Sequence, residues 1–149
     1  MKMHEKLMNM SGYTYLPEGY DQAALTVYNR YVDFETERCD APKPVSFVAF
    51  LFEDVEHRRL DAFEWPKGVL VKTKNGDIGV TTGWDVVETL SAITNSTTFT
   101  VKVRTAKGEL GYLADGIAKA EIPPEVLEYV KSTLQVKVHD KVDEAFSGK

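Results

Sequence analysis

Hydrophobic and polar residues alternate in the same way in two stretches of the chain. Residues 69–80 read VLVKTKNGDIGV and residues 101–112 read VKVRTAKGELGY, so the second stretch repeats the first at an offset of 32 positions. Successive side chains of a strand point to opposite faces of a sheet, and the alternation therefore predicts strands with one buried face. Asn75-Gly76 and Lys107-Gly108 lie near the centres of the stretches and are typical of tight turns. The sequence thus predicts two β-hairpins.

A two-residue loop at each turn determines the predicted register of both hairpins. In the first hairpin Val71 then faces Val80, and the second hairpin follows the same rule. The side chains predicted to face the core are Val69, Val71, Thr73, Ile78, Val80 and Thr82 in the first copy and Val101, Val103, Thr105, Leu110, Tyr112 and Ala114 in the second.

The opposite face of each hairpin is predicted to be polar. Its side chains are Lys72, Lys74, Asp77, Lys102, Arg104 and Glu109. Lys74 and Asp77 face each other across the first turn and are expected to pair. Gly79 and Gly111 occupy equivalent positions in the two copies, where a glycine indicates a bend in the sheet or a closely packed neighbour.

Two segments before the hairpins are predicted to be strands. In residues 25–34, LTVYNRYVDF, the spacing of Leu25, Tyr28 and Val32 is compatible with a helix, but the β-branched and aromatic residues favour a strand. The prolines of residues 40–44 then break the chain. Residues 45–52, VSFVAFLF, are apolar on both faces, which predicts a buried central strand.

Three further segments have helical signals. Residues 53–65 read as a short helix or an ordered connection, and Asp85 with Glu88 has the spacing of a capping box before a short helix at residues 86–93. Pro123 and Pro124 are suited to the start of a C-terminal helical segment over residues 124–146, in which the helix either ends near Leu134 or gives way to a strand.

Together these elements predict a single α+β domain over residues 13–149, preceded by a mobile tail at residues 1–12. The sheet is expected to be a small curled antiparallel sheet or an SH3-like barrel, with a C-terminal helix. The pattern V-[KR]-T-x-x-G-[DE]-[IL]-G at residues 71–79 and 103–111 resembles SH3-like small barrels of the Tudor and KOW type. Residues 25–37, LTVYNRYVDFETE, resemble the opening of small proteins of phage and prophage structural modules, which implies a phage or mobile-element origin.

Composition narrows the classes of function. The net charge of −5 over 149 residues argues against a general binder of polyanions. Cys39 is the only cysteine and lies among acidic residues, which indicates an ordinary thiol and fits a cytoplasmic location. No apolar run reaches the roughly 18 residues of a membrane-spanning helix, so no membrane association is expected.

One polar cluster could support catalysis. Carboxylates and an imidazole can bind a divalent cation or exchange protons, and residues 53–57 supply Glu53, Asp54, Glu56 and His57. The cluster does not match the H-E-x-x-H motif, and a solvated charged connection is the favoured interpretation. A metal-assisted hydrolase therefore remains an alternative to a protein without catalysis, and no cofactor is predicted.

Two binding surfaces are also predicted. Lys72, Lys74, Lys102 and Arg104 could form a basic face for nucleic acid, with Trp65 or Trp84 for stacking. Tyrosine is enriched at interface hot spots, and the candidates are Tyr13, Tyr15, Tyr20, Tyr28 and Tyr31, which could otherwise simply cover the core. The leading hypothesis is a non-catalytic protein-binding module, either an assembly component or an inhibitor of a host protein. Its acidic charge suits a basic partner, and homo-oligomers remain an open alternative.

Overall fold

The computed structural model of the chain forms two compact units. The described residues are 22–38, 44–51, 57–90, 92–93, 95–121, 123–139 and 145–146. The first unit combines Met1–Glu64 with Val86–Phe99, and the second combines Trp65–Asp85 with Thr100–Lys149. The predicted tail at residues 1–12 and Cys39 lie outside the described residues.

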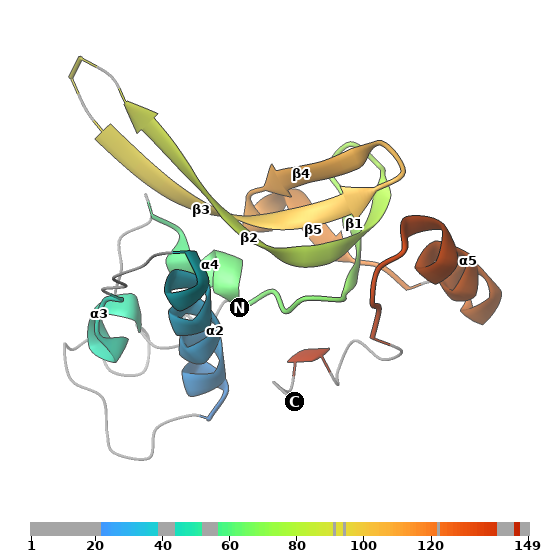
Figure 1. Cartoon of the computed structure of the whole chain (residues 1–149), viewed down its shortest axis with the longest axis horizontal. Coiled ribbons are helices and arrows are strands. Elements are labelled where there is room, and N and C mark those ends of the chain that lie inside the picture. Colours follow the sequence, from blue (N-terminus) through green and yellow to red (C-terminus); the bar gives the residue numbers. More distant parts are fainter. Residues whose placement is uncertain are drawn as a thin grey trace. The chain divides into compact units, whose positions relative to one another are not determined.

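Five antiparallel strands form an open sheet in the order β4-β3-β2-β1-β5 (Figure 1). The strands are β1 (Leu70–Thr73), β2 (Ile78–Leu90), β3 (Asn95–Thr105), β4 (Gly108–Tyr112) and β5 (Ile117–Lys119). The predicted α+β class with an antiparallel sheet and a C-terminal helix is confirmed. Because the sheet has two edges, it matches the open form of the prediction and not a closed barrel.

The first predicted hairpin forms, but its register differs by one residue from the prediction. The observed pairs are Leu70–Val80, Val71–Gly79 and Lys72–Ile78. Three residues form the loop, which is closed by the Thr73 N–H donating to the Asp77 carbonyl at 2.8 Å, and Gly76 has a φ of 91°. A three-residue loop with glycine in the left-handed region is a common hairpin connection. The predicted pairing of Val71 with Val80 is therefore wrong, and the slip moves Val80 to the opposite face.

The second hairpin keeps its predicted faces because its register slips by two residues, but Leu110, which was predicted to face the core, is 64% exposed. Thr105 pairs with Gly108 across a loop of two residues, Ala106 and Lys107, so the turn lies one residue before the predicted one. Lys102, Arg104 and Glu109 share the outer face, as predicted. Val101, Val103 and Thr105 are buried on the inner face.

Both faces of the sheet contribute to the core of the second unit. The inner face buries Val69, Val71, Thr73, Thr81, Val101, Val103 and Thr105. On the other face Leu70 and Val80 pack with Val130 of α5 (Pro124–Leu134). The predicted C-terminal helix is confirmed, and it ends at Leu134, where Gln135 takes a left-handed conformation with a φ of 53°.

The first unit contains the helices α2 (Gln22–Arg38), α3 (Phe47–Leu51) and α4 (Arg59–Phe63). Residues 25–34 form part of α2, so the strand favoured there is wrong. The side chains that turn inward are Ala24, Val27 and Tyr31, and their spacing of three and four residues is that of a helix face. The helical spacing of Leu25, Tyr28 and Val32 thus pointed to the correct element. Leu25 is nevertheless 38% exposed.

Residues 47–51 also form a helix in place of the predicted central strand. The Ser46 hydroxyl accepts a hydrogen bond from the Ala49 N–H at 3.2 Å, which caps the first turn. Phe50 and Leu51 are adjacent in sequence and both fully buried. Residues 53–65 contain the short helix α4, as predicted.

Aromatic rings form the core of the first unit. Phe63 of α4 lies 5.5 Å from the Tyr31 ring and 5.7 Å from the Phe99 ring, and Tyr31 stacks on Phe50 at 4.9 Å. The Arg30 guanidinium donates to the carbonyls of Phe63 and Glu64 at 3.0 and 3.1 Å. Arg30 therefore joins α2 to the end of α4, and burial lowers the pKa of its guanidinium while Glu64 opposes the shift.

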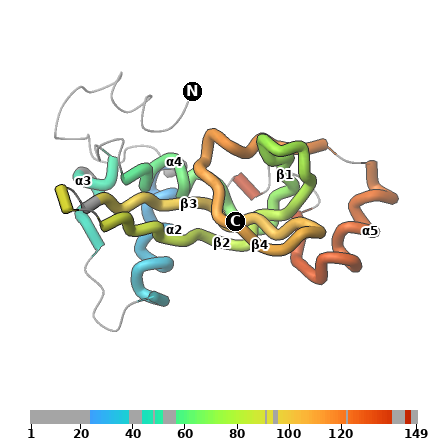
Figure 2. The backbone as a smooth tube through the Cα atoms, turned by 90° about the horizontal axis from the view of Figure 1, so that it is seen from above, coloured from blue at the N-terminus to red at the C-terminus, as the bar shows by residue number. Residues whose placement is uncertain are grey.

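Residues 86–90 continue β2, so the helix predicted at residues 86–93 is wrong. Strand β3 begins at Asn95 and returns beside β2 (Figure 2). Hydrogen bonds to the neighbouring strand satisfy the backbone N–H and C=O groups of this segment, so it does not need to form a capped helix.

Candidate functional site

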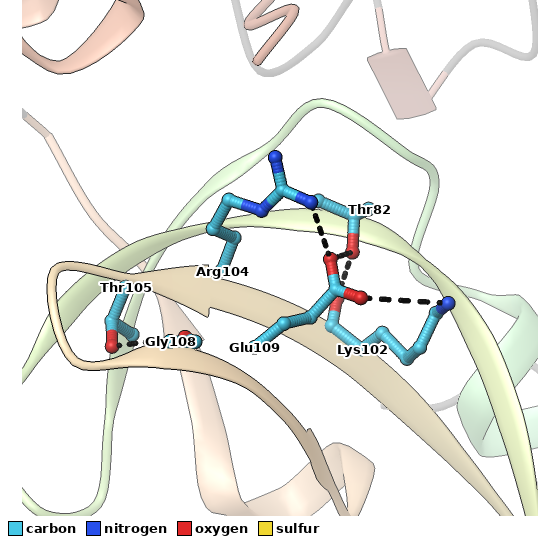
Figure 3. Close-up of polar contacts among 6 residues, drawn as sticks. All are labelled: Thr82, Lys102, Arg104, Thr105, Gly108 and Glu109. Atoms are coloured by element: carbon cyan, nitrogen blue, oxygen red, sulfur yellow. Dashed lines mark hydrogen bonds and ion pairs between the residues drawn. The ribbon is translucent and has the colours of Figure 1, made fainter. Parts of the chain in front are cut away.

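A carboxylate network occupies the outer face of the β3–β4 hairpin (Figure 3). The Thr82 hydroxyl donates to the Glu109 carboxylate at 2.8 Å, and Arg104 and Lys102 lie 3.4 and 3.6 Å from that carboxylate. Arg104 is paired directly with Glu109 across the strands, and Lys102 is two residues along. We call these four residues the Glu109 network.

The Glu109 carboxylate is stabilised in its ionised form. The hydrogen bond from Thr82 lowers its pKa most, burial opposes this as the second-largest effect, and the charges of Lys102 and Arg104 lower the pKa further. Two of the four cations predicted to bind nucleic acid, Lys102 and Arg104, are thus engaged by a carboxylate of their own chain. A phosphate would have to compete with Glu109 for them.

Replacing Glu109 with glutamine should make the stability of the chain less dependent on pH. A lowered pKa means that the ionised Glu109 stabilises the fold above its ordinary pKa of 4.5, and that this contribution is lost as the pH falls through the folded-state value. We expect the urea midpoint of the wild type to exceed that of Glu109→Gln at pH 7, and the two midpoints to converge near pH 3. A difference that persists unchanged at pH 3 would contradict this assignment.

The other two predicted basic residues lie at a different place. Lys72 and Lys74 line a shallow pocket of about 200 Å³ together with Thr73 and residues 115–118. Strand β2 separates β1, which carries Lys72, from β3, which carries the other pair. Neither lysine forms an ion pair with any described residue. The expected pairing of Lys74 with Asp77 is not formed, since the Asp77 carboxylate pairs with Lys107 at 3.1 Å.

The two tryptophans do not offer open stacking surfaces. Trp84 is only 9% exposed, its indole N–H donates to the Trp65 carbonyl at 3.1 Å, and Lys67 lies 5.4 Å from its ring centre. The Trp65 ring packs edge-on against Phe146 at 5.7 Å. The prediction that they would stack on bases therefore has no support in their positions.

Tyr28 and Tyr31 belong to the core of the first unit. Tyr31 is 2% exposed, which favours the alternative interpretation, that it covers the core. The Tyr28 hydroxyl donates to the Val45 carbonyl and the Tyr31 hydroxyl accepts from the Val45 N–H, both at 2.9 Å. Burial raises the pKa of the Tyr31 hydroxyl. Tyr13, Tyr15 and Tyr20 lie outside the described residues.

The predicted metal cluster is described only at His57. Glu53, Asp54 and Glu56 lie outside the described residues. In the part of the chain that is described, no group of three or more His, Cys, Asp or Glu side chains is arranged to hold a metal ion. The His57 carbonyl accepts a hydrogen bond from the Phe99 N–H at 2.9 Å, which ties His57 to the aromatic core of the first unit.

Among the described residues, the two most exposed large apolar side chains lie between the end of β2 and the start of β3. We call residues 85–93 the hairpin end. Within it Val87 is 49% exposed, Leu90 77% and Ile93 92%. Asp85 and Glu88 are its only charged residues. The sequence predicts a helix at residues 86–93 and therefore does not predict this exposed surface.

None of the described helices is long and apolar enough to cross a membrane. Comparison of the chain with protein-family models, curated proteins and solved structures found no significant match.

Proposed function

We propose that this chain is a non-catalytic protein-binding module that holds its partner through the hairpin end. The supporting observation is the exposure of Leu90 and Ile93, which are 77% and 92% accessible although both are large and apolar. Fully burying such a side chain stabilises a complex by roughly 1.5–3 kcal/mol. Two large apolar side chains this exposed at one end of a hairpin offer apolar area that a bound partner would bury.

The charge of the surrounding unit indicates the chemistry of the partner. The first unit contains 7 Lys and Arg against 13 Asp and Glu residues, a net charge of −6, whereas the second unit contains 11 against 10, a net charge of +1. The hairpin end itself carries two carboxylates and no cation. A partner with an apolar depression and a basic rim would complement it in both respects. An assembly component and an inhibitor of a cytoplasmic host protein both fit this proposal.

Replacing Leu90 and Ile93 together with serine should abolish partner binding. Loss of two apolar anchors is expected to weaken binding by at least about 3 kcal/mol, or more than about 100-fold. Affinity capture with quantitative mass spectrometry would compare the double variant with the wild type. Tyr129→Ser is the matched control, because Tyr129 is 67% exposed on α5 in the other unit.

The proposal requires that the same proteins are retained by the wild type and by Tyr129→Ser but not by the double variant. Circular dichroism spectra should be the same for all three chains. A basic partner should also be lost on raising the salt concentration and with Glu88→Lys. Equal capture by the wild type and the double variant would refute a role for the hairpin end.

A further inference from the structure

Strand β4 forms one edge of the sheet, and that edge is exposed along its length. Among the described strands its one neighbour is β3, and Gly108 to Gly111 are all exposed. Leu110 shares a face with Val103, its partner on β3, but Val103 is fully buried whereas Leu110 is 64% exposed. A Cβ placed on Gly108 would meet no atom within 4 Å. Exposed strand edges are templates for adding another strand, and β4 lacks the prolines and outward lysines that usually block this.

The register of β4 determines which backbone groups are available to another strand. Thr105 and Gly108 flank a two-residue loop, where a hydrogen-bonded pair is expected, and pairs alternate from there along an antiparallel ladder. Val103–Leu110 is then also a hydrogen-bonded pair. The backbone N–H and C=O groups of Glu109 and Gly111 consequently point away from β3, toward the open edge.

We propose that two copies of this chain pair antiparallel through β4, about a two-fold axis at Leu110. In this register Glu109 of each copy lies opposite Gly111 of the other, so the outward backbone groups of both residues form hydrogen bonds. Leu110 meets Leu110 of the second copy as a non-hydrogen-bonded pair, in which side chains approach most closely. Tyr112 lies across from Gly108 of the second copy, and an aromatic ring can cover a glycine in such a pair.

The charges on the outer face support this register. On the outer face, a row of side chains runs across the paired strands. It contains Lys102 and Gly111 of one copy, followed by Glu109 and Arg104 of the second copy. Each carboxylate therefore lies between its own Arg104 and, beyond a glycine without a side chain, Lys102 of the other copy. An axis at Glu109 would instead place two carboxylates directly opposite each other, which is destabilising. Opposite charges alternate along the row only when the axis is at Leu110.

Pairing along one short strand buries less area than a standard interface of about 1,600 Å². We therefore expect a dimer that forms at about 500 µM chain and dissociates on dilution to about 5 µM. Sedimentation equilibrium of the full chain would measure this. Leu110→Arg places two like charges at the axis and should raise the dissociation constant by more than about tenfold, whereas Ile78→Arg, at another exposed apolar position of the second unit, should not.

Cysteine cross-linking tests the register itself. In a Cys39→Ser background, Leu110→Cys places two thiols at the axis, where Cα atoms about 4.5 Å apart suit a disulfide. Tyr112→Cys lies on the same face of the same strand, but its thiols would be about 13 Å apart. Oxidation should link Leu110→Cys chains and leave Tyr112→Cys chains largely unlinked. A wild-type chain that stays monomeric at 500 µM, or equal linking of the two cysteine variants, would overturn the proposal.

Discussion

Phe63→Ala is expected to lower the free energy of unfolding by about 3–5 kcal/mol. The Phe63 ring is fully buried and lies within 5.7 Å of the rings of Tyr31, Phe34 and Phe99, measured between centroids. Removing it leaves a cavity at the centre of the first unit, because the surrounding rings are held by the backbones of α2 and β3 and cannot all move inward. Urea unfolding followed by circular dichroism would measure the loss.

Phe47→Ala serves as the control for this prediction. Phe47 is partly exposed at the margin of the aromatic cluster, where its ring lies 5.3 Å from the ring of Tyr28. It should destabilise the chain clearly less than Phe63→Ala. Similar losses for both substitutions would mean that the aromatic core is not centred on Phe63.

Gly79→Ala is expected to lower the free energy of unfolding by about 3 kcal/mol. A Cβ at residue 79 would lie 2.6 Å from the Arg104 carbonyl oxygen and 2.7 Å from Cγ1 of Val103. The nearest obstacle is a backbone atom within the sheet, so relief requires β2 to move away from β3. The close packing of this position was one of the two roles predicted for the glycine in the repeated motif.

Gly116→Ala is the matched control. A Cβ at residue 116 would meet only Cδ of Lys74 at 3.8 Å, an ordinary contact with a flexible side chain. Thermal unfolding of both variants should therefore show a large decrease in the midpoint for Gly79→Ala and a small one for Gly116→Ala. Comparable midpoints would show that the sheet adapts to the extra methyl group.

The repeated motif does not produce a repeated structure. In the first copy Gly79 lies opposite Val71, on the buried face, whereas in the second copy Gly111 lies opposite Lys102, on the outer face. The difference arises from the loops, which contain three residues in the first hairpin and two in the second. This one-residue difference is what leaves Glu109 and Gly111 together on the outer face of β4, where the proposed pairing uses them.

The sequence by itself determined the elements whose signals are local. The turn residues of the two hairpins, and the prolines before α5, act through backbone geometry within a few residues, and both hairpins and the helix are present. The outward positions of Lys102, Arg104 and Glu109 followed from alternation alone. Their binding to one another did not, because it depends on the final register and on Thr82 from the neighbouring strand.

Only the tertiary structure decided the segments with mixed signals. Residues 25–34 contain good strand formers, but their aromatic side chains form a shared core when α2 is helical, and burial of rings outweighs the small differences in intrinsic propensity. Conversely, Asp85 and Glu88 have the spacing of a capping box, which predicts a helix, yet β3 supplies backbone partners that extend β2 to Leu90. The exposure of Leu90 and Ile93, on which the proposed function rests, follows from that choice. Non-local partners determined it, and no local pattern contains them.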